Sequence, residues 1–287
     1  MPKSPLTPPG PLETLLDVSE GTPFSLPPEL ATFYGDLRFP QRSKRPHVVA
    51  NFAETLDGIV AFGSPGAAGG TAITGSNGAD RALMGLLRAS ADAVVVGAGT
   101  LRSVPLHLWT GEHIFPPLAP AFQEFRRNRG KTPEPVNAIV TRSGDLDLSL
   151  PVFSSNRVPV VIFTSEEGAR RLRSRSVLPS LSVVPLAASG TLSAAQIVTA
   201  LDRRAPSDLI LVEGGPHLMG DFLDEGLLDE LFLTVSPQVG GRSDGEARLG
   251  FVEGRTFGPN RPLWGSLRSI KRSGSHLFLR FGFSRPG

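Results

Sequence analysis

Short apolar runs separated by stretches with helical spacing predict an alternating order of strands and helices. Unbroken apolar runs are typical of strands buried on both faces. The expected strands are 47–52, 59–62, 93–96, 136–141, 158–164, 181–184, 209–212 and 230–236. The expected helices are 76–88, about 166–174, 194–203 and 216–225. This order predicts an α/β fold with a mixed, mainly parallel central sheet and helices on both faces.

Polar residues and prolines refine this picture at the helix starts and the chain ends. Ser76 is the expected N-cap of the first helix, and Thr164-x-x-Glu167 and Ser193-x-x-Gln196 have the spacing of capping boxes. Within helix 76–88, Arg81 and Arg88 are seven residues apart and share a face. At the end, alternating Leu277, Leu279, Phe281 and Phe283 predict a strand, which makes a C-terminal antiparallel hairpin with a turn in 271–275.

Two stretches rich in proline have little periodicity. Residues 1–45 are interpreted as an N-terminal extension to a single domain, 46–287, on which Phe33, Tyr34, Leu37 and Phe39 are expected to pack. Residues 103–135 are expected to form a long irregular insertion. The basic cluster near its end is expected to be a solvated face, and comprises Arg126, Arg127, Arg129 and Lys131.

Composition narrows the function classes. The chain has 287 residues, of which 40% are hydrophobic and 20% charged, as in ordinary globular proteins. A net charge of +2 is too small to indicate a nucleic-acid partner. The absence of cysteine excludes disulfides, thiolate metal sites and a cysteine nucleophile, and no metal site is predicted. No apolar run is long enough to span a membrane and no signal peptide is recognised, so a cytoplasmic location is expected.

Two glycine turns follow buried strands and are the first candidates for a ligand site. One is Gly97-Ala-Gly-Thr100 and the other is Glu213-Gly-Gly-Pro216, which leads into a helix at His217 and Leu218. A helix N-terminus after a glycine turn favours a phosphate group, although an ordinary strand-to-helix turn has the same pattern. Because Arg102 stands where the dinucleotide fingerprint needs a small residue, a Rossmann domain is not expected.

The two turns are expected to open on the same edge of the sheet, because the carboxyl ends of parallel strands meet there. Asp57, in the turn Thr55–Gly58, joins them if that turn points the same way. A ligand cleft at this edge is therefore predicted.

Several motifs in order resemble a known family. They are Arg45–Gly58, Ile73-Thr-Gly75, Leu87–Thr100, Val212–Pro216 and Gly226–Pro237. Together they resemble the reductase domain of bacterial riboflavin biosynthesis, which is the C-terminal domain of the bifunctional deaminase-reductase and has a dihydrofolate reductase-like fold. The similarity is greatest to stand-alone pyrimidine reductases, and no zinc deaminase motif is present.

The resemblance implies an NADPH-dependent reduction and a homodimer. The substrate would be a phosphoribosylamino-pyrimidinone whose opened ribose takes hydride at C1′. The implied cofactor contacts, together with the glycines of the turns, are Ala53, Thr74, Gly97, Gly99, Thr100, Ser143, Gly214, Gly215, Pro216, His217 and Leu218. The substrate contacts would be Asn51, Arg88 and Glu213, and either Asp57 or Glu213 would relay the proton. Arg142 is the candidate for the 2′-phosphate of NADPH.

The chain also departs from the family pattern. Asn51 replaces the usual lysine, and residues 101–110 lack the Asp-Asp-Pro and the later arginine that contacts substrate. Two alternatives therefore stay open. One is a reductase of the same fold for a different pyrimidine, pterin or carbonyl substrate, and the other is a non-catalytic nucleotide-binding protein.

Overall fold

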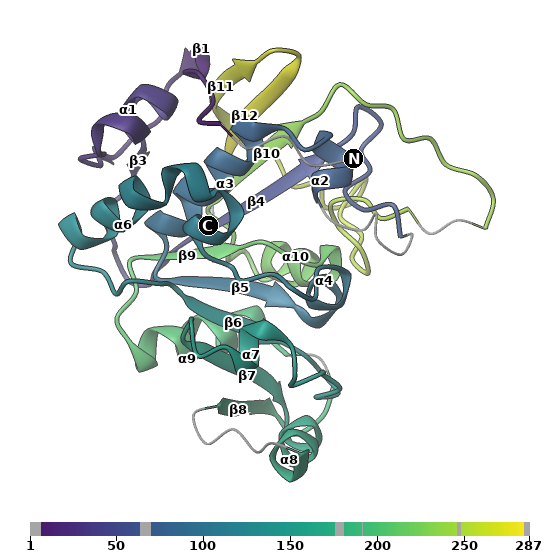
Figure 1. The fold of residues 1–287 in the computed structure, drawn as a ribbon. Helices are drawn as coiled ribbons and strands as arrows, with labels where there is room; N and C mark the ends of the chain where they lie inside the picture. The colour runs from purple at the N-terminus through teal and green to yellow at the C-terminus, as the bar shows by residue number, and fades with distance from the viewer. Residues whose placement is uncertain (1–6, 64–69, 176–180, 191, 246–247, 284–287) are drawn as a thin grey trace, which may run out of the picture.

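The fold is built around one large mixed sheet, seen in a computed structural model that describes residues 7–63, 70–175, 181–190, 192–245 and 248–283 (Figure 1). The strands are β1 Glu13–Asp17, β2 Thr22–Pro23, β3 Arg38–Phe39, β4 His47–Glu54, β5 Ala93–Gly97, β6 Val136–Val140, β7 Val160–Ser165, β8 Ser182–Ala187, β9 Leu209–Val212, β10 Glu230–Val235, β11 Gly265–Ser273 and β12 His276–Phe283. The helices are α1 Pro28–Tyr34, α2 Gly70–Thr74, α3 Gly78–Ser90, α4 Ala98–Ser103, α5 Gly111–Ile114, the 3₁₀ turn η1 Pro116–Leu118, α6 Ala119–Asn128, α7 Pro151–Ser154, α8 Glu166–Arg175, α9 Ala194–Arg204 and α10 Pro216–Asp224.

The strand order is β1-β11-β12-β10-β4-β9-β5-β6-β7-β8. Strands β10, β4, β9, β5, β6, β7 and β8 pair in parallel, whereas β12, β11 and β1 add antiparallel strands at one side. The predicted class, a mainly parallel sheet with a C-terminal antiparallel hairpin, is confirmed. The hairpin turn is tight and centres on Gly274, whose φ is +59°.

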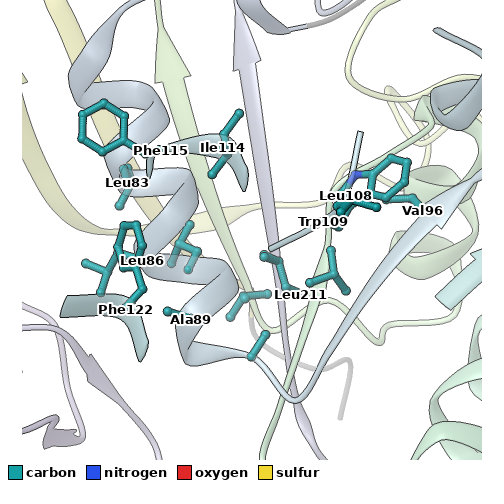
Figure 2. Packing of buried hydrophobic residues seen from close by; sticks show 14 of the residues in the cluster. Leu83, Leu86, Ala89, Val96, Leu108, Trp109, Ile114, Phe115, Phe122 and Leu211 are labelled. Atoms are coloured by element: carbon teal, nitrogen blue, oxygen red, sulfur yellow. The ribbon is translucent and has the colours of Figure 1, made fainter. Parts of the chain in front are cut away.

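Both faces of the parallel sheet are buried, which explains the unbroken apolar runs. Neighbouring residues on one strand join opposite cores: Val48 and Val95 pack in one cluster, and Val49 and Val94 in the other. Helices α1, α3 and α6 supply the second cluster, and α9 and α10 the first. Figure 2 shows the α3 face, where Leu86 lies beside Phe122.

The described part of the N-terminal extension belongs to this body. Phe33, Tyr34, Leu37 and Phe39 are all buried in the α3 core, as expected. Strand β1 pairs with β11 and so becomes the edge strand of the large sheet. The extension thus completes both a core and a sheet.

The prediction of an irregular insertion at 103–135 is wrong. Most of its centre is helical, in α5, η1 and α6. Pro116 and Pro120 stand at the starts of η1 and α6, where a missing N–H costs little. The prolines begin these helices, and Phe122 and Phe125 pack into the core.

The prediction of a solvated basic face is also wrong for most of the cluster. The Arg126 side chain is buried and donates to the carbonyl oxygens of Ala89 (3.1 Å) and Ala91 (2.7 Å). Lys131 pairs with Asp92, and the Arg129 guanidinium stacks on an aromatic ring. Arg126 therefore binds the carbonyl oxygens at the end of helix α3, and Arg129 and Lys131 make their own contacts beside it.

Three local predictions change in detail. Residues 59–62 form no strand beyond a single bridge at Ala61, because the backbone turns back at once onto Thr55. Helix α3 is capped by Asn77, whose side chain accepts from the Asp80 N–H, while Ser76 adopts a positive φ of 64°. The capping box predicted at Ser193 is present. The one predicted at Thr164 is not, because the Ser165 hydroxyl accepts from the Gly168 N–H in the first turn of α8.

Among the described residues, no helix combines the length and apolarity needed to cross a bilayer.

Candidate functional site

The two glycine turns meet at the carboxyl edge of the parallel sheet. Strands β5 and β9 are parallel neighbours, and the Gly97 N–H donates to the Gly214 carbonyl oxygen at 3.4 Å. A β-carbon on Gly214 would lie 2.5 Å from the Thr100 hydroxyl oxygen, so only glycine fits there. Helices α4 and α10 start side by side from these turns (Figure 1). The predicted meeting of the turns is confirmed.

The backbone around these turns can accept an anion. Gly215 precedes α10 with φ +78°, and no side chain caps this helix start. The first N–H groups of α10 therefore keep hydrogen-bonding capacity, and the helix dipole favours negative charge there. A β-carbon on Gly99 would meet no atom within 4 Å, so space lies above that backbone. This cradle suits a pyrophosphate.

A cavity of about 330 Å³ opens beside the cradle. It gathers many of the residues singled out in the sequence, namely Asn51, Ala53, Arg88, Gly99, Thr100, Glu213, Gly214, Gly215, Pro216 and His217. Asn51 and Ala53 come from β4, Arg88 from α3, and the rest from the second turn and the starts of α4 and α10. Segments more than 150 residues apart in sequence therefore build one site.

Other predicted residues lie outside the cavity lining. Gly97 and Leu218 do not line the cavity, and Leu218 is buried in the core that α9 and α10 form with the sheet. The Thr74 hydroxyl donates to the Gly70 carbonyl oxygen of its own helix (3.1 Å) and also lies near the Asp80 carboxyl. Arg142 and Ser143 are exposed just beyond β6, on the same edge of the sheet but farther along it.

Asp57 is not a cavity residue either, and its carboxylate has a structural task. It accepts hydrogen bonds from the Thr55 hydroxyl (2.6 Å) and from the N–H groups of Gly240 (3.0 Å) and Gly241 (2.8 Å). These bonds, that from Thr55 first, hold the pKa of Asp57 well below its usual range. A carboxylate bound in this way is a poor proton donor, so the geometry does not favour the catalytic role expected for Asp57.

Arg88 and Glu213 bind each other. The Arg88 Nη2 donates to Glu213 Oε2 at 2.6 Å and Nε lies 3.0 and 3.1 Å from the two oxygens, with both side chains buried. The side chain of Arg88 leans from the end of α3 toward the carboxyl edge, as helical side chains do. Its positive charge is thus neutralised inside the protein. The expectation that Arg88 pairs mainly with a substrate phosphate does not fit this geometry.

A neutral histidine is a further hydrogen-bond partner of Arg88. His107 Nε2 lies 2.8 Å from Arg88 Nη1. Burial first, and then the Arg88 guanidinium, hold the pKa of His107 far below its usual value. His107 is therefore neutral, with Nε2 as acceptor and the proton on Nδ1. It occupies part of segment 101–110, where the family arginine is missing.

Asp80 is a cavity residue that the sequence reasoning missed. It stands in the first turn of α3, is buried, and lines the cavity. Burial raises the pKa of Asp80 to about 6; the Thr234 and Thr74 hydroxyls oppose this rise and the charge of Glu213 adds to it. In the sequence it reads as an ordinary acidic residue at a helix start. Only tertiary contacts reveal a carboxyl that can be protonated near neutral pH.

Comparisons with known proteins place the chain in a family. The model of the RibD C-terminal domain family matches residues 46–256. The riboflavin biosynthesis protein RibD of Aquifex aeolicus is 24% identical over 207 residues, covering 69% of this chain and 48% of that protein. A protein of Archaeoglobus fulgidus, named 2,5-diamino-6-ribosylamino-4(3H)-pyrimidinone 5′-phosphate reductase, is 25% identical over 214 residues, covering 71% and 89%. This chain thus spans about half the length of the Aquifex relative and most of the Archaeoglobus one.

A solved structure shows the same fold. A pyrimidine reductase-like protein from Corynebacterium diphtheriae matches with a TM-score of 0.63 and 22% identity, over 84% of this chain and 93% of that one. The fold is a dihydrofolate reductase-like α/β domain, and a cavity lies at the carboxyl edge of its sheet. The chain belongs to the RibD C-terminal domain family.

Proposed function

We propose that this chain is an NADPH-dependent reductase of the riboflavin pathway. Its substrate would be 5-amino-6-(5-phosphoribosylamino)uracil or a close analogue, whose ribose is reduced to a ribityl chain. The names of the relatives support a pyrimidine reductase. The observation that carries the proposal is the meeting of the Gly97 and Gly214 turns beside a cavity with a buried carboxyl.

The residues at the cavity edge fit a nicotinamide nucleotide. The backbone at Gly99, Gly215 and His217 would hold the pyrophosphate, with the Thr100 hydroxyl as a further donor. Arg142, exposed beyond β6, is the proposed partner of the 2′-phosphate. When bound, NADPH supplies a hydride.

The substrate would lie over Asn51 and the Arg88–Glu213 pair. The Asn51 amide can both donate to and accept from a pyrimidine ring. Glu213 accepts hydrogen bonds from Arg88, and its oxygens can also accept from ring or ribityl donors. The buried Arg88–Glu213 pair also fixes the shape of the cavity wall that it forms.

Asp80 is the proposed proton source. In the open-chain imine, hydride adds to C1′ and the π electrons of the C=N bond move to nitrogen, which takes a proton. The protonated Asp80 carboxyl supplies that proton, becomes a carboxylate and is reprotonated from solvent. A pKa of about 6 keeps this carboxyl closer to its protonated form than an exposed aspartate would be.

The decisive experiment follows NADPH absorbance at 340 nm with the phosphoribosylamino-pyrimidine as substrate. Substrate-dependent loss of absorbance and a ribityl product by mass spectrometry are expected. Tight NADPH binding without turnover would instead favour a non-catalytic nucleotide-binding protein. We also expect a cytoplasmic homodimer, for which light scattering of the purified chain measures the mass.

A reductase for another pyrimidine or a pterin is the second candidate. The observation in its favour is Asp80, because a buried carboxyl suits a ring edge with two adjacent N–H donors. Turnover of such a ring without any sugar phosphate would select it.

A further inference from the structure

The cavity holds a second arginine that the sequence pattern had placed on the Arg88 face of α3. Arg81 lies two helical turns before Arg88 and lines the same cavity. It is partly exposed, whereas Arg88 is buried. The two cations therefore differ in what can reach them.

The hydrogen bond of Arg81 uses only its Nε and leaves both Nη groups available. Its Nε donates to the carbonyl oxygen of Ile114 at 3.1 Å, and Ile114 is itself a cavity residue. In the part of the chain that the structure describes, the two Nη nitrogens have no hydrogen-bond partner. A guanidinium fixed through Nε presents its Nη groups in a defined direction, which is the arrangement that binds a phosphate through two hydrogen bonds.

The charges along the cavity wall favour an anion beside Arg81. Glu213 neutralises Arg88 through a direct ion pair. The carboxyl of Asp80 is buried, and an incoming anion would promote its protonation further. Arg81 interacts with the charge of Asp80 but makes no ion pair with any described residue, so its guanidinium can still pair with a ligand.

We propose that Arg81, rather than Arg88, binds the phosphate of the substrate and makes the cavity selective for a sugar phosphate monoester. This inference rests on the proposed function, since it assigns the phosphate of that substrate. It also offers a replacement for the arginine that is missing from residues 101–110.

The test measures binding without turnover. The NADPH-saturated protein is titrated calorimetrically with ribose 5-phosphate, ribose and inorganic phosphate. Wild type is expected to bind ribose 5-phosphate at least about tenfold more tightly than ribose. Arg81→Gln is expected to weaken ribose 5-phosphate binding about 10- to 100-fold and leave ribose binding unchanged. Arg81→Lys should retain part of the affinity, because it keeps the charge but loses the paired geometry.

Arg127→Gln, at an exposed position of α6 outside the cavity, is the matched control and should behave as wild type. Unfolding curves of each variant separate lost binding from lost folding. Equal affinity of wild type and Arg81→Gln for ribose 5-phosphate would overturn the inference. If Arg81→Gln removes the preference while the pyrimidine is not turned over, the Arg81 assignment stands and the proposed substrate fails.

Discussion

Two buried arginines, Arg88 and Arg126, lie at the end of helix α3 and have different partners. Arg126 donates to backbone carbonyl oxygens of Ala89, Ala91 and Thr132, and it lines no part of the cavity. Arg88 donates to a carboxylate and a neutral histidine, and all three side chains line the cavity. Burial of a cation therefore does not mark a functional site. The cavity distinguishes them: Arg88 and its carboxylate and histidine partners line it, whereas Arg126 does not.

The largest expected effect comes from removing each of these arginines. Arg88→Met leaves Glu213 buried without its cation, which should lower the free energy of unfolding by about 3–5 kcal/mol and abolish turnover. Arg126→Met leaves several carbonyl groups unpaired and should cost roughly 2–4 kcal/mol, with turnover per folded molecule within about twofold of wild type. Denaturant unfolding and the 340 nm assay measure both quantities.

The double variant Arg88→Met with Glu213→Gln should recover stability but not activity, because it removes the unpaired charge without restoring the wall. Loss of turnover per folded molecule in Arg126→Met would break the distinction between the two arginines.

The second effect concerns the proton. Asp80→Asn is expected to lower kcat about 100-fold or more, as for loss of a general acid. In wild type, kcat should fall as pH rises through about 6, because the protonated carboxyl is depleted there. Asp80→Asn should lose this dependence. A variant with the wild-type pH profile would rule out Asp80 as proton source.

Stability provides the control for Asp80. Its pKa is raised from 3.8 to about 6, so the folded state binds more protons than the unfolded state between these values. Folding stability from this group therefore falls as pH rises from about 4 to 6 and stays low above. Asp80→Asn removes that penalty and should be more stable than wild type at pH 8, by at most about 3 kcal/mol.

The third effect concerns how closely NADPH can approach the backbone at the glycine turns. Gly99→Ala should leave stability nearly unchanged, because its β-carbon would enter open space, yet weaken NADPH binding about tenfold if the cofactor lies against that backbone. Gly78→Ala, also in open space but outside the cavity, is the control. Calorimetric titration with NADPH compares them; equal affinities would place the cofactor elsewhere.

The smallest effect is expected for Arg142→Ala, since this side chain is exposed and a surface contact contributes little. The preference for NADPH over NADH in kcat/KM should fall several-fold, with the NADH value unchanged. An unaltered preference would exclude Arg142 as the 2′-phosphate partner.

The sequence predicted the features that depend on local pattern. The apolar runs predicted the strands of the parallel sheet, and the glycine turns at Gly97 and Gly214 predicted its carboxyl edge.

The features that the sequence did not predict depend on contacts between distant segments. Prolines in residues 103–135 looked like breakers because their place at helix starts was not evident. Asp80 looked like a helix-start acid, and Arg126 like a surface charge, because only the packed chain shows what surrounds them.

The central claim is that two distant turns hold a single nicotinamide nucleotide. Amide NMR of the ¹⁵N-labelled protein during NADPH titration tests it directly. The backbone signals of Gly97, Gly99, Gly214 and Gly215 should shift together, with one shared dissociation constant. Shifts confined to one turn, or none at saturating NADPH, would contradict the account.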